Sequence, residues 1–229
     1  MVIRQRAIQA EDKQERYRAI LDAATRLLVR EPDRVASVSE VADEAGLAKG
    51  TVYLYFPSKE ELLLALHERN IDGFFRPLIE RLESREPMAI DDLFALTRDH
   101  IVAPPLFLPL ASRVLGMMAQ AIPPEAAAAF HERMIARLMR AGAGVERHFP
   151  QLKTGEGLVL LRHSYAVIVG LWQMYGAKGD ALHCPATGLP FEGDGEALNF
   201  TYADDLQRAL DALWKGALGA AADSNGGLR

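Results

Sequence analysis

Apolar residues recur at helical spacing along almost the whole chain, and this periodicity limits the possible folds more than any other feature of the sequence. One helix face is formed by residues at i, i+3, i+4, i+7 and i+8, namely Ile20, Ala23, Ala24, Leu27 and Leu28. The alternation of apolar and polar residues that marks a half-buried strand never persists beyond a few positions. The sequence therefore predicts an all-α protein, and its 49% hydrophobic and 25% charged residues are typical of a globular chain.

Two serine–glutamate pairs mark helix starts near the N-terminus. Ser37 with Glu40, and Ser58 with Glu61, have the spacing of a capping box, in which hydroxyl and carboxylate satisfy free N–H groups of the first turn. Gly46 stands where a helix commonly needs a left-handed residue at its end. Helices are expected over residues 11–30, 37–46, 48–56 and 58–75, the last ending before Pro77, and then near 89–102, 106–121, 124–142, 155–176 and 199–220.

Charge is unevenly distributed over the 229 residues, whose formal net charge is −5. Residues 1–60 hold ten Lys or Arg against ten Asp or Glu, and Arg4 and Arg6 occur in the first ten residues without an acid. A neutral N-terminal part on an acidic chain is compatible with a local anion-binding face. The N-terminus lacks the apolar run of a secretion signal, and polar residues interrupt the apolar stretch 158–175, so we expect a cytoplasmic protein that spans no membrane.

Residues 177–198 are rich in Gly, Pro and Asp and predict a loop. This segment contains Cys184, the single cysteine of the chain, which therefore has no partner for an intramolecular disulfide. The neighbouring His183 raises the question of a metal site, but no further His or Cys stands at ligand spacing. No nucleophile elbow, phosphate loop or carboxylate pair indicates catalysis, so neither a metal, a cofactor nor an enzymatic activity is expected.

The short helix predicted after Gly46 divides its side chains among distinct faces. Val52 and Phe56 face the core, Lys49 and Tyr53 form a second face, and Thr51 and Tyr55 form a third. A helix this short depends on its neighbours for stability. The three-residue turn 46–48 between two helices is typical of a helix-turn-helix, whose second helix enters the DNA major groove.

In such a groove each exposed residue type has a chemical use. Lys49 can donate to guanine O6 or N7, the Tyr53 ring can pack on a thymine methyl, and Gly50 permits close approach of the backbone. Hydroxyl groups and a cation are placed to bind phosphate oxygens, namely those of Ser37, Thr51, Tyr55 and Lys59. Taken singly, the two tyrosines can equally be packing residues and the two lysines solvated ones.

The run "SVSEVADEAGLAKGTVYLYFPSKEELLLALHE", residues 37–68, resembles the DNA-binding domain of the TetR family of bacterial transcriptional regulators. The resemblance implies a helix-turn-helix domain over 13–60, a linking helix to about residue 75, and a ligand-binding and dimerisation domain over 76–222. It also implies a homodimeric repressor that a small apolar or aromatic effector releases from a palindromic operator in double-stranded DNA. Ala48 departs from the family pattern, which often has Ser or Thr there, so a helix cap worth about 1 kcal/mol is missing.

Two further patterns lie in the C-terminal part. By resemblance, an effector cavity is expected among its helices, with Arg113, Met117, Met134, His163 and Trp172 as candidate contacts, although Met and aromatic residues at helical spacing are commonly core. A seam with steps of 3 and 4 suits either an intramolecular contact or the homodimer that the family favours, and it comprises Ala203, Leu206, Leu210, Leu213 and Ala217.

Two other functions are compatible with these patterns. One is a helical small-molecule binder or enzyme in which the N-terminal motif is incidental. The other is a regulator that acts through a protein partner at the C-terminal seam rather than through an effector.

Overall fold

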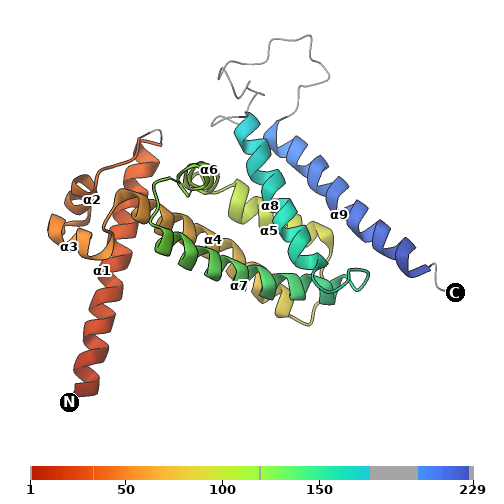
Figure 1. Ribbon diagram of the computed structural model, residues 1–229, viewed down its shortest axis with the longest axis horizontal. Coiled ribbons are helices and arrows are strands. Elements are labelled where there is room, and N and C mark those ends of the chain that lie inside the picture. Colours follow the sequence, from red (N-terminus) through yellow and green to blue (C-terminus); the bar gives the residue numbers. More distant parts are fainter. Residues whose placement is uncertain (1, 33, 119, 176–200, 227–229) are drawn as a thin grey trace, which may run out of the picture. The chain divides into compact units, whose positions relative to one another are not determined.

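The structure is a computed structural model that describes residues 2–32, 34–118, 120–175 and 201–226, with side chains from residue 11 to residue 219. The described residues form helices joined by short connections and contain no strand, which confirms the all-α prediction (Figure 1). The helices are α1 (Val2–Arg30), α2 (Val38–Ala45), α3 (Lys49–Tyr55), α4 (Lys59–Glu83), α5 (Ile90–Thr97), the π-helical turn η1 (Arg98–Val102), α6 (Phe107–Met117), α7 (Pro124–His148), α8 (Glu156–Tyr175) and α9 (Tyr202–Gly226).

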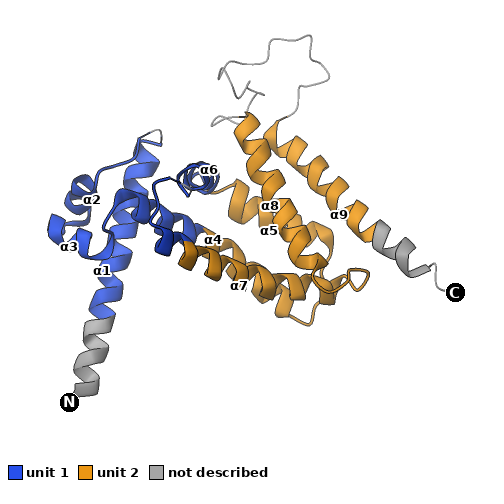
Figure 2. Cartoon of the chain, in the orientation of Figure 1, with its two compact units in different colours: residues 1–70, 105–127 blue, residues 71–104, 128–229 orange. Residues whose placement is uncertain are grey.

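The chain divides into two compact units (Figure 2). Unit 1 comprises residues 1–70 and 105–127, and unit 2 comprises residues 71–104 and 128–229. Helices α4 and α7 each contribute residues to both units. Within the described part of the chain, no single helix is long and apolar enough to span a membrane, and α5–η1 and α6 meet that test only when taken together as a bent pair.

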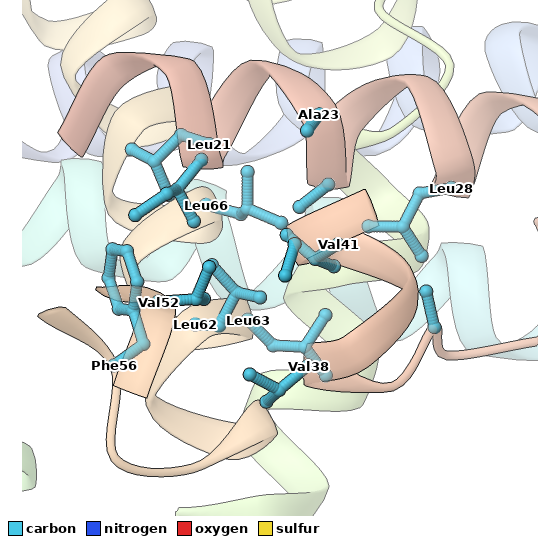
Figure 3. Close-up of a cluster of buried hydrophobic side chains, with 14 of the residues drawn as sticks. Leu21, Ala23, Leu28, Val38, Val41, Val52, Phe56, Leu62, Leu63 and Leu66 are labelled. Carbon is cyan, nitrogen blue, oxygen red and sulfur yellow. The ribbon is translucent and has the colours of Figure 1, made fainter. Parts of the chain in front are cut away.

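Unit 1 has one apolar core, to which α1, α2, α3 and the first turns of α4 contribute (Figure 3). The periodic face predicted for α1 is the face that packs: Ile20 and Ala23 are fully buried, whereas Asp22 between them is exposed. Figure 3 shows Val52 of α3 and Phe56, directly after α3, in the same cluster as Leu62 and Leu66 of α4. This shared core brings the short helices together.

The capping residues predicted from the sequence begin α2 and α4. The Ser37 hydroxyl accepts a hydrogen bond from the Glu40 N–H at 3.3 Å, and the Ser37 N–H donates to the Glu40 carboxylate at 2.8 Å. The Ser58 hydroxyl accepts from the Glu61 N–H at 3.1 Å and lies 3.1 Å from its carboxylate. Both caps satisfy N–H groups that would otherwise lack partners in the first helical turn.

Helix α4 continues past Pro77 to Glu83, so the predicted end near Phe75 was wrong. Proline inside a helix removes one hydrogen bond and crowds the preceding turn. The residues around it oppose this cost, because Phe74, Phe75 and Leu78 are all buried. Apolar packing on both sides of the proline thus keeps the segment helical, and a local breaker signal does not reveal such packing.

Helices α7 and α8 of unit 2 approach each other through glycines. A Cβ atom added at Gly142 would lie 2.6 Å from the backbone N of Leu158, and one added at Gly157 would lie 2.4 Å from the Gly142 carbonyl oxygen. The Glu146 carboxylate closes the turn by accepting hydrogen bonds from the N–H groups of Gly155 at 2.8 Å and Gly157 at 3.0 Å. Because these glycines serve helix packing, α7 runs on to His148 rather than ending near residue 142 as predicted.

Helix α9 packs against α8 through a face that only partly matches the predicted seam. Tyr202 and Trp214 are buried: the Tyr202 hydroxyl donates to the Ile168 carbonyl at 3.0 Å, and the Trp214 indole N–H donates to Ser164 Oγ at 2.9 Å. Of the predicted seam, Leu206 and Leu210 are buried in this unit, Leu213 and Ala217 are half-buried, and Ala203 is exposed. The buried stripe therefore has steps of four residues and is anchored by aromatic side chains.

His67 is a buried polar residue of α4 in unit 1. Its side chain is 2% exposed, and its ring stands edge-on to that of Phe107, with 5.7 Å between centroids. Burial lowers the pKa of His67 to about 4, because the low-dielectric surroundings disfavour the imidazolium form. The ring is therefore neutral at pH 7 and packs as part of the core.

No group of three or more His, Cys, Asp or Glu side chains within the described ranges is arranged to hold a metal ion. His183, Cys184 and the predicted loop 177–198 lie outside the described residues.

Replacing Gly142 by alanine is expected to destabilise the protein by about 1–3 kcal/mol, since the added methyl group would meet the α8 backbone rather than a movable side chain. Gly73→Ala is the matched control, because a Cβ atom at this position of α4 meets nothing within 4 Å. The control should gain about 0.5–1 kcal/mol from helix propensity. Urea denaturation of the two variants tests this, and equal stability would contradict the close crossing.

Acid should remove the stability contributed by the neutral His67. Its folded-state pKa of about 4 lies below the ordinary 6.5, so the contribution is complete above pH 6.5 and is lost as the pH falls towards 4. The loss should reach roughly 3 kcal/mol, at 1.36 kcal/mol per pKa unit. Denaturation midpoints of the wild type and His67→Leu between pH 7 and 4 test this: the wild type should lose more stability, and parallel curves would contradict the assignment.

Candidate nucleic-acid interface

Helix α3 is held in place from one side only. Val52 is fully buried and Phe56, directly after the helix, is 3% exposed. The Tyr17 ring of α1 packs against this end of α3, with its centroid 5.2 Å from that of Phe56 and 6.4 Å from that of Tyr55. A helix of seven residues is too short to persist alone in water, so these contacts stabilise it.

A three-residue turn sets the angle between α2 and α3. Gly46 adopts φ 67°, a left-handed conformation that glycine takes at no steric cost, and the Leu47 N–H donates to the Ala42 carbonyl at 2.9 Å. Ala48 then precedes α3 in an extended conformation, and its side chain makes no capping hydrogen bond. The Ala48 carbonyl accepts from the Thr51 N–H at 2.8 Å, so the chain enters the helix without the cap. This is the geometry of a helix-turn-helix.

The opposite side of α3 carries polar groups that face solvent. Lys49, Gly50 and Tyr53 are exposed, whereas Thr51 and Tyr55 are half-buried. The Lys49 ammonium lies 5.8 Å from the centroid of the Tyr53 ring, within the range of a cation–π contact. Lys49 is exposed, and no ion pair among the described residues involves it.

Ser37 and Lys59 lie at two helix starts: Ser37 caps α2, and Lys59 is the first residue of α4, which follows α3. The Ser37 hydroxyl accepts the capping hydrogen bond from the Glu40 N–H and also hydrogen-bonds to the Glu40 carboxylate. Lys59 is the first residue of α4 and is exposed; its ammonium is 3.8 Å from the Glu60 carboxylate. An exposed pair at this distance holds the lysine only weakly.

Arginines near the motif are engaged inside unit 1. The Glu44 carboxylate of α2 accepts a hydrogen bond from Arg26 Nε at 2.7 Å and another from Arg30, both on α1. The hydrogen bonds from Arg26 and Arg30 lower the pKa of Glu44. Likewise, Arg34 binds the Glu40 carboxylate and lowers its pKa to about 2, with the Ser37 backbone contributing. These hydrogen bonds help to position α2, while the three arginine side chains stay 49–58% exposed.

A second tie joins α4 to α1. Arg69 Nη1 donates to the Asp22 carboxylate at 2.6 Å, and Arg69 Nη2 donates to the Leu21 carbonyl at 3.3 Å and to the Thr25 hydroxyl. The helix that carries Lys59 is thereby fastened to the helix that supports α3.

Leu54 was not among the predicted DNA contacts, although its side chain belongs to the same exposed surface of α3. Its side chain is 85% exposed, the largest value among the large hydrophobic side chains described. The signal was present in the sequence, because Leu54 follows Gly50 by four residues and is two residues from Val52, which places it opposite the buried side.

The five candidate effector contacts belong to different units. In unit 1, the Arg113 guanidinium donates to the Pro32 carbonyl and Met117 packs against the apolar core. In unit 2, Met134 is half-buried, His163 is exposed, and Trp172 stands edge-on to Tyr202 at a centroid distance of 5.4 Å. Their role in ligand binding stays a prediction.

Comparison with known proteins identifies the family. Residues 20–66 match the family described as bacterial regulatory proteins, tetR family, and residues 68–221 match the tetracyclin repressor-like C-terminal domain. Together the two matches include the helix-turn-helix and most of the chain that follows it. They contradict the alternative of an enzyme in which the N-terminal motif is incidental.

Curated relatives agree with this assignment over the part that they share. The chain is 37% identical over 73 residues to the fatty acid metabolism regulator protein of Bacillus subtilis, a match that covers 32% of this chain and 36% of the relative. It is 40% identical over 79 residues to the HTH-type transcriptional regulator EthR of Mycolicibacterium smegmatis, covering 34% and 33%. The chain thus spans about a third of the length of these relatives.

Solved structures share the fold over more of the chain. A TetR family transcriptional regulator, PfmR of Thermus thermophilus, superposes with a TM-score of 0.52 at 18% identity over 86% of this chain and 97% of its own. A TetR-family regulator from Mesorhizobium loti gives a TM-score of 0.54 at 20% identity over 90% and 96%. With the helix-turn-helix geometry and both family matches in agreement, the chain belongs to the TetR family of bacterial transcriptional regulators.

Proposed function

We propose that this regulator represses transcription by binding a palindromic DNA operator as a homodimer in the cytoplasm, and that a small-molecule effector releases it. One observation carries the proposal: α3 is fixed by Val52 and Phe56 on one side and presents Lys49 and Tyr53 on the other. A helix held in this way enters the major groove without having to fold on binding, so little conformational entropy opposes the contact.

The exposed groups divide into base-reading and phosphate-binding ones. Lys49 is suited to donate to guanine, and the Tyr53 ring, held by its cation–π contact, is suited to pack on a thymine methyl. Gly50 lets the backbone approach the bases. Phosphate oxygens are the proposed partners of Ser37, Thr51, Tyr55 and Lys59.

Dimerisation through α8 and α9 would place two such helices one groove turn apart, at about 34 Å. Small residues on the exposed side of α9 support this arrangement: Ala212, Gly216 and Gly219 are exposed, and a Cβ atom added at either glycine meets nothing within 4 Å. The burial of Leu206 and Leu210 within the chain removes them from any outward-facing seam, which disfavours a protein partner at that stripe.

Effector release requires a ligand that binds the two states of the dimer with different affinity, typically by about 1–3 kcal/mol. We assign DNA binding to a domain over residues 13–60, linked by α4 to a ligand-binding and dimerisation domain over 76–222. The effector is proposed to be a small apolar or aromatic molecule. The candidate contacts remain Arg113, Met117, Met134, His163 and Trp172.

Lys49→Ala and Tyr53→Ala are each expected to weaken operator binding about 5- to 150-fold, which corresponds to about 1–3 kcal/mol for a good base contact. The operator is first isolated by selection from random duplex DNA with the wild-type protein. Affinities are then measured by fluorescence anisotropy at several salt concentrations. If both variants bound the selected operator as tightly as the wild type, α3 would not be the reading helix.

Two controls separate these contacts from general effects. Lys153→Ala removes an exposed lysine in the turn after α7 and should leave operator affinity unchanged. Tyr53→Phe keeps the ring and removes the hydroxyl, so it should retain most of the affinity if the ring packs on a thymine methyl.

Gly216→Arg is expected to convert the dimer into a monomer and to reduce operator affinity at least tenfold, because both half-sites are then bound independently. The side chain enters open space in the single chain, so the fold should be preserved. Light scattering coupled to size exclusion gives the mass of each species. Gly73→Arg, an equally open position on α4, should remain dimeric; a dimeric Gly216→Arg with normal operator binding would contradict the proposed interface.

A further inference from the structure

The side chain of Leu54 is out of place for a globular surface. It is 85% exposed, whereas the next most exposed large hydrophobic side chain described, Met139, is 60% exposed. Single exposed apolar residues are common on protein surfaces, so exposure alone assigns no role. The residues around Leu54 on α3 indicate its role.

Leu54 stands at the centre of the outward face of α3. Successive residues of a helix are about 100° apart, so Leu54 lies about 200° from the buried Val52. Gly50, one turn earlier on the same face, has no side chain and leaves the space beside Leu54 open. Lys49 with Tyr53 forms one edge of this face, and Thr51 with Tyr55 forms the other.

We infer that Leu54 is a specificity residue that packs against the C5-methyl group of a thymine in each operator half-site. The inference rests on the proposed function, since it requires that α3 enters the major groove. A leucine offers neither a donor nor an acceptor to a base edge, and the thymine methyl is the apolar group that the major groove presents.

The flanking groups favour DNA over a protein partner. An apolar docking surface is contiguous, whereas the exposed neighbours of Leu54 on α3 are a cation, a glycine and a phenol. Hydroxyl groups and the exposed Lys49 ammonium suit phosphates and base edges, so these polar groups on both edges of α3 orient the helix in the groove. Leu54, between the two edges, then contacts the thymine methyl. The residue contributes selectivity because the water-exposed leucine and the methyl are both buried on binding.

The experiment combines a protein variant with an altered base. In the operator selected by the wild type, each thymine is replaced in turn by uracil, which lacks only the methyl group. At one position per half-site the wild type should lose about fourfold in affinity, equivalent to ~0.8 kcal/mol for one buried carbon at 1.4 kcal/mol per tenfold. This penalty should remain in Tyr53→Ala, which distinguishes the position from a thymine that the Tyr53 ring contacts. Leu54→Ala should bind the thymine operator more weakly and should show no further loss with uracil at that position.

Leu115→Ala is the matched control, because it makes the same change at a 49% exposed leucine of α6 in unit 1 and should keep the full uracil penalty. Melting temperatures of both variants should equal that of the wild type, since neither side chain is buried. The assignment would be overturned if Leu54→Ala kept the uracil penalty at every position where the wild type shows one, or if no uracil changed the wild-type affinity. If the wild type selected no operator at all, the proposed function itself would fail, which is a separate result.

Discussion

The burial of two side chains, Val52 and Phe56, is the interaction on which the exposed face of α3 depends. Helix α3 has seven residues, and Ala48 directly before it supplies no side-chain cap, so neither length nor capping keeps it folded. The core of unit 1 performs that task by fixing one side of the helix. Because one side of α3 is fixed in this way, the side chains on its other side, including Lys49 and Tyr53, are exposed to solvent.

Polar contacts complement the apolar core, because some charged side chains form ion pairs between helices and others form none. Arg26 and Arg30 are held by Glu44, and Arg69 is held by Asp22, in each case across two helices. Lys49 has no such partner among the described residues. In a chain of net charge −5, attraction to a polyanion must come from particular exposed cations rather than from the sum of charges.

Local signals predicted what local interactions determine. The caps at Ser37 and Ser58 and the turn at Gly46 lie where the spacing indicated, because each involves residues three or four apart. Long-range packing decided the rest. Helix α4 passes Pro77 because buried neighbours on both sides hold it, and α7 continues through Gly142 because another helix needs the space that the glycine leaves.

The candidate site was predictable to the same degree. The polar side chains of α3 could be assigned from their residue types and their helical positions. Leu54 was overlooked because apolar residues are usually expected to pack, although its helical position opposite Val52 already placed it on the exposed side of α3. The seam on α9 was predicted in part: Leu206 and Leu210 are buried, but the buried stripe also includes Tyr202 and Trp214, which the predicted seam left out.

The glycine crossing of α7 and α8 also limits how unit 2 can move. With the Gly142 and Leu158 backbones in direct contact, sliding either helix along the other would drive side chains of the adjacent turns into the opposing main chain. The Glu146 carboxylate, bound to two N–H groups beyond the turn, prevents the pair from hinging open there. The close approach and these two hydrogen bonds therefore oppose relative motion of α7 and α8 at this end of the pair.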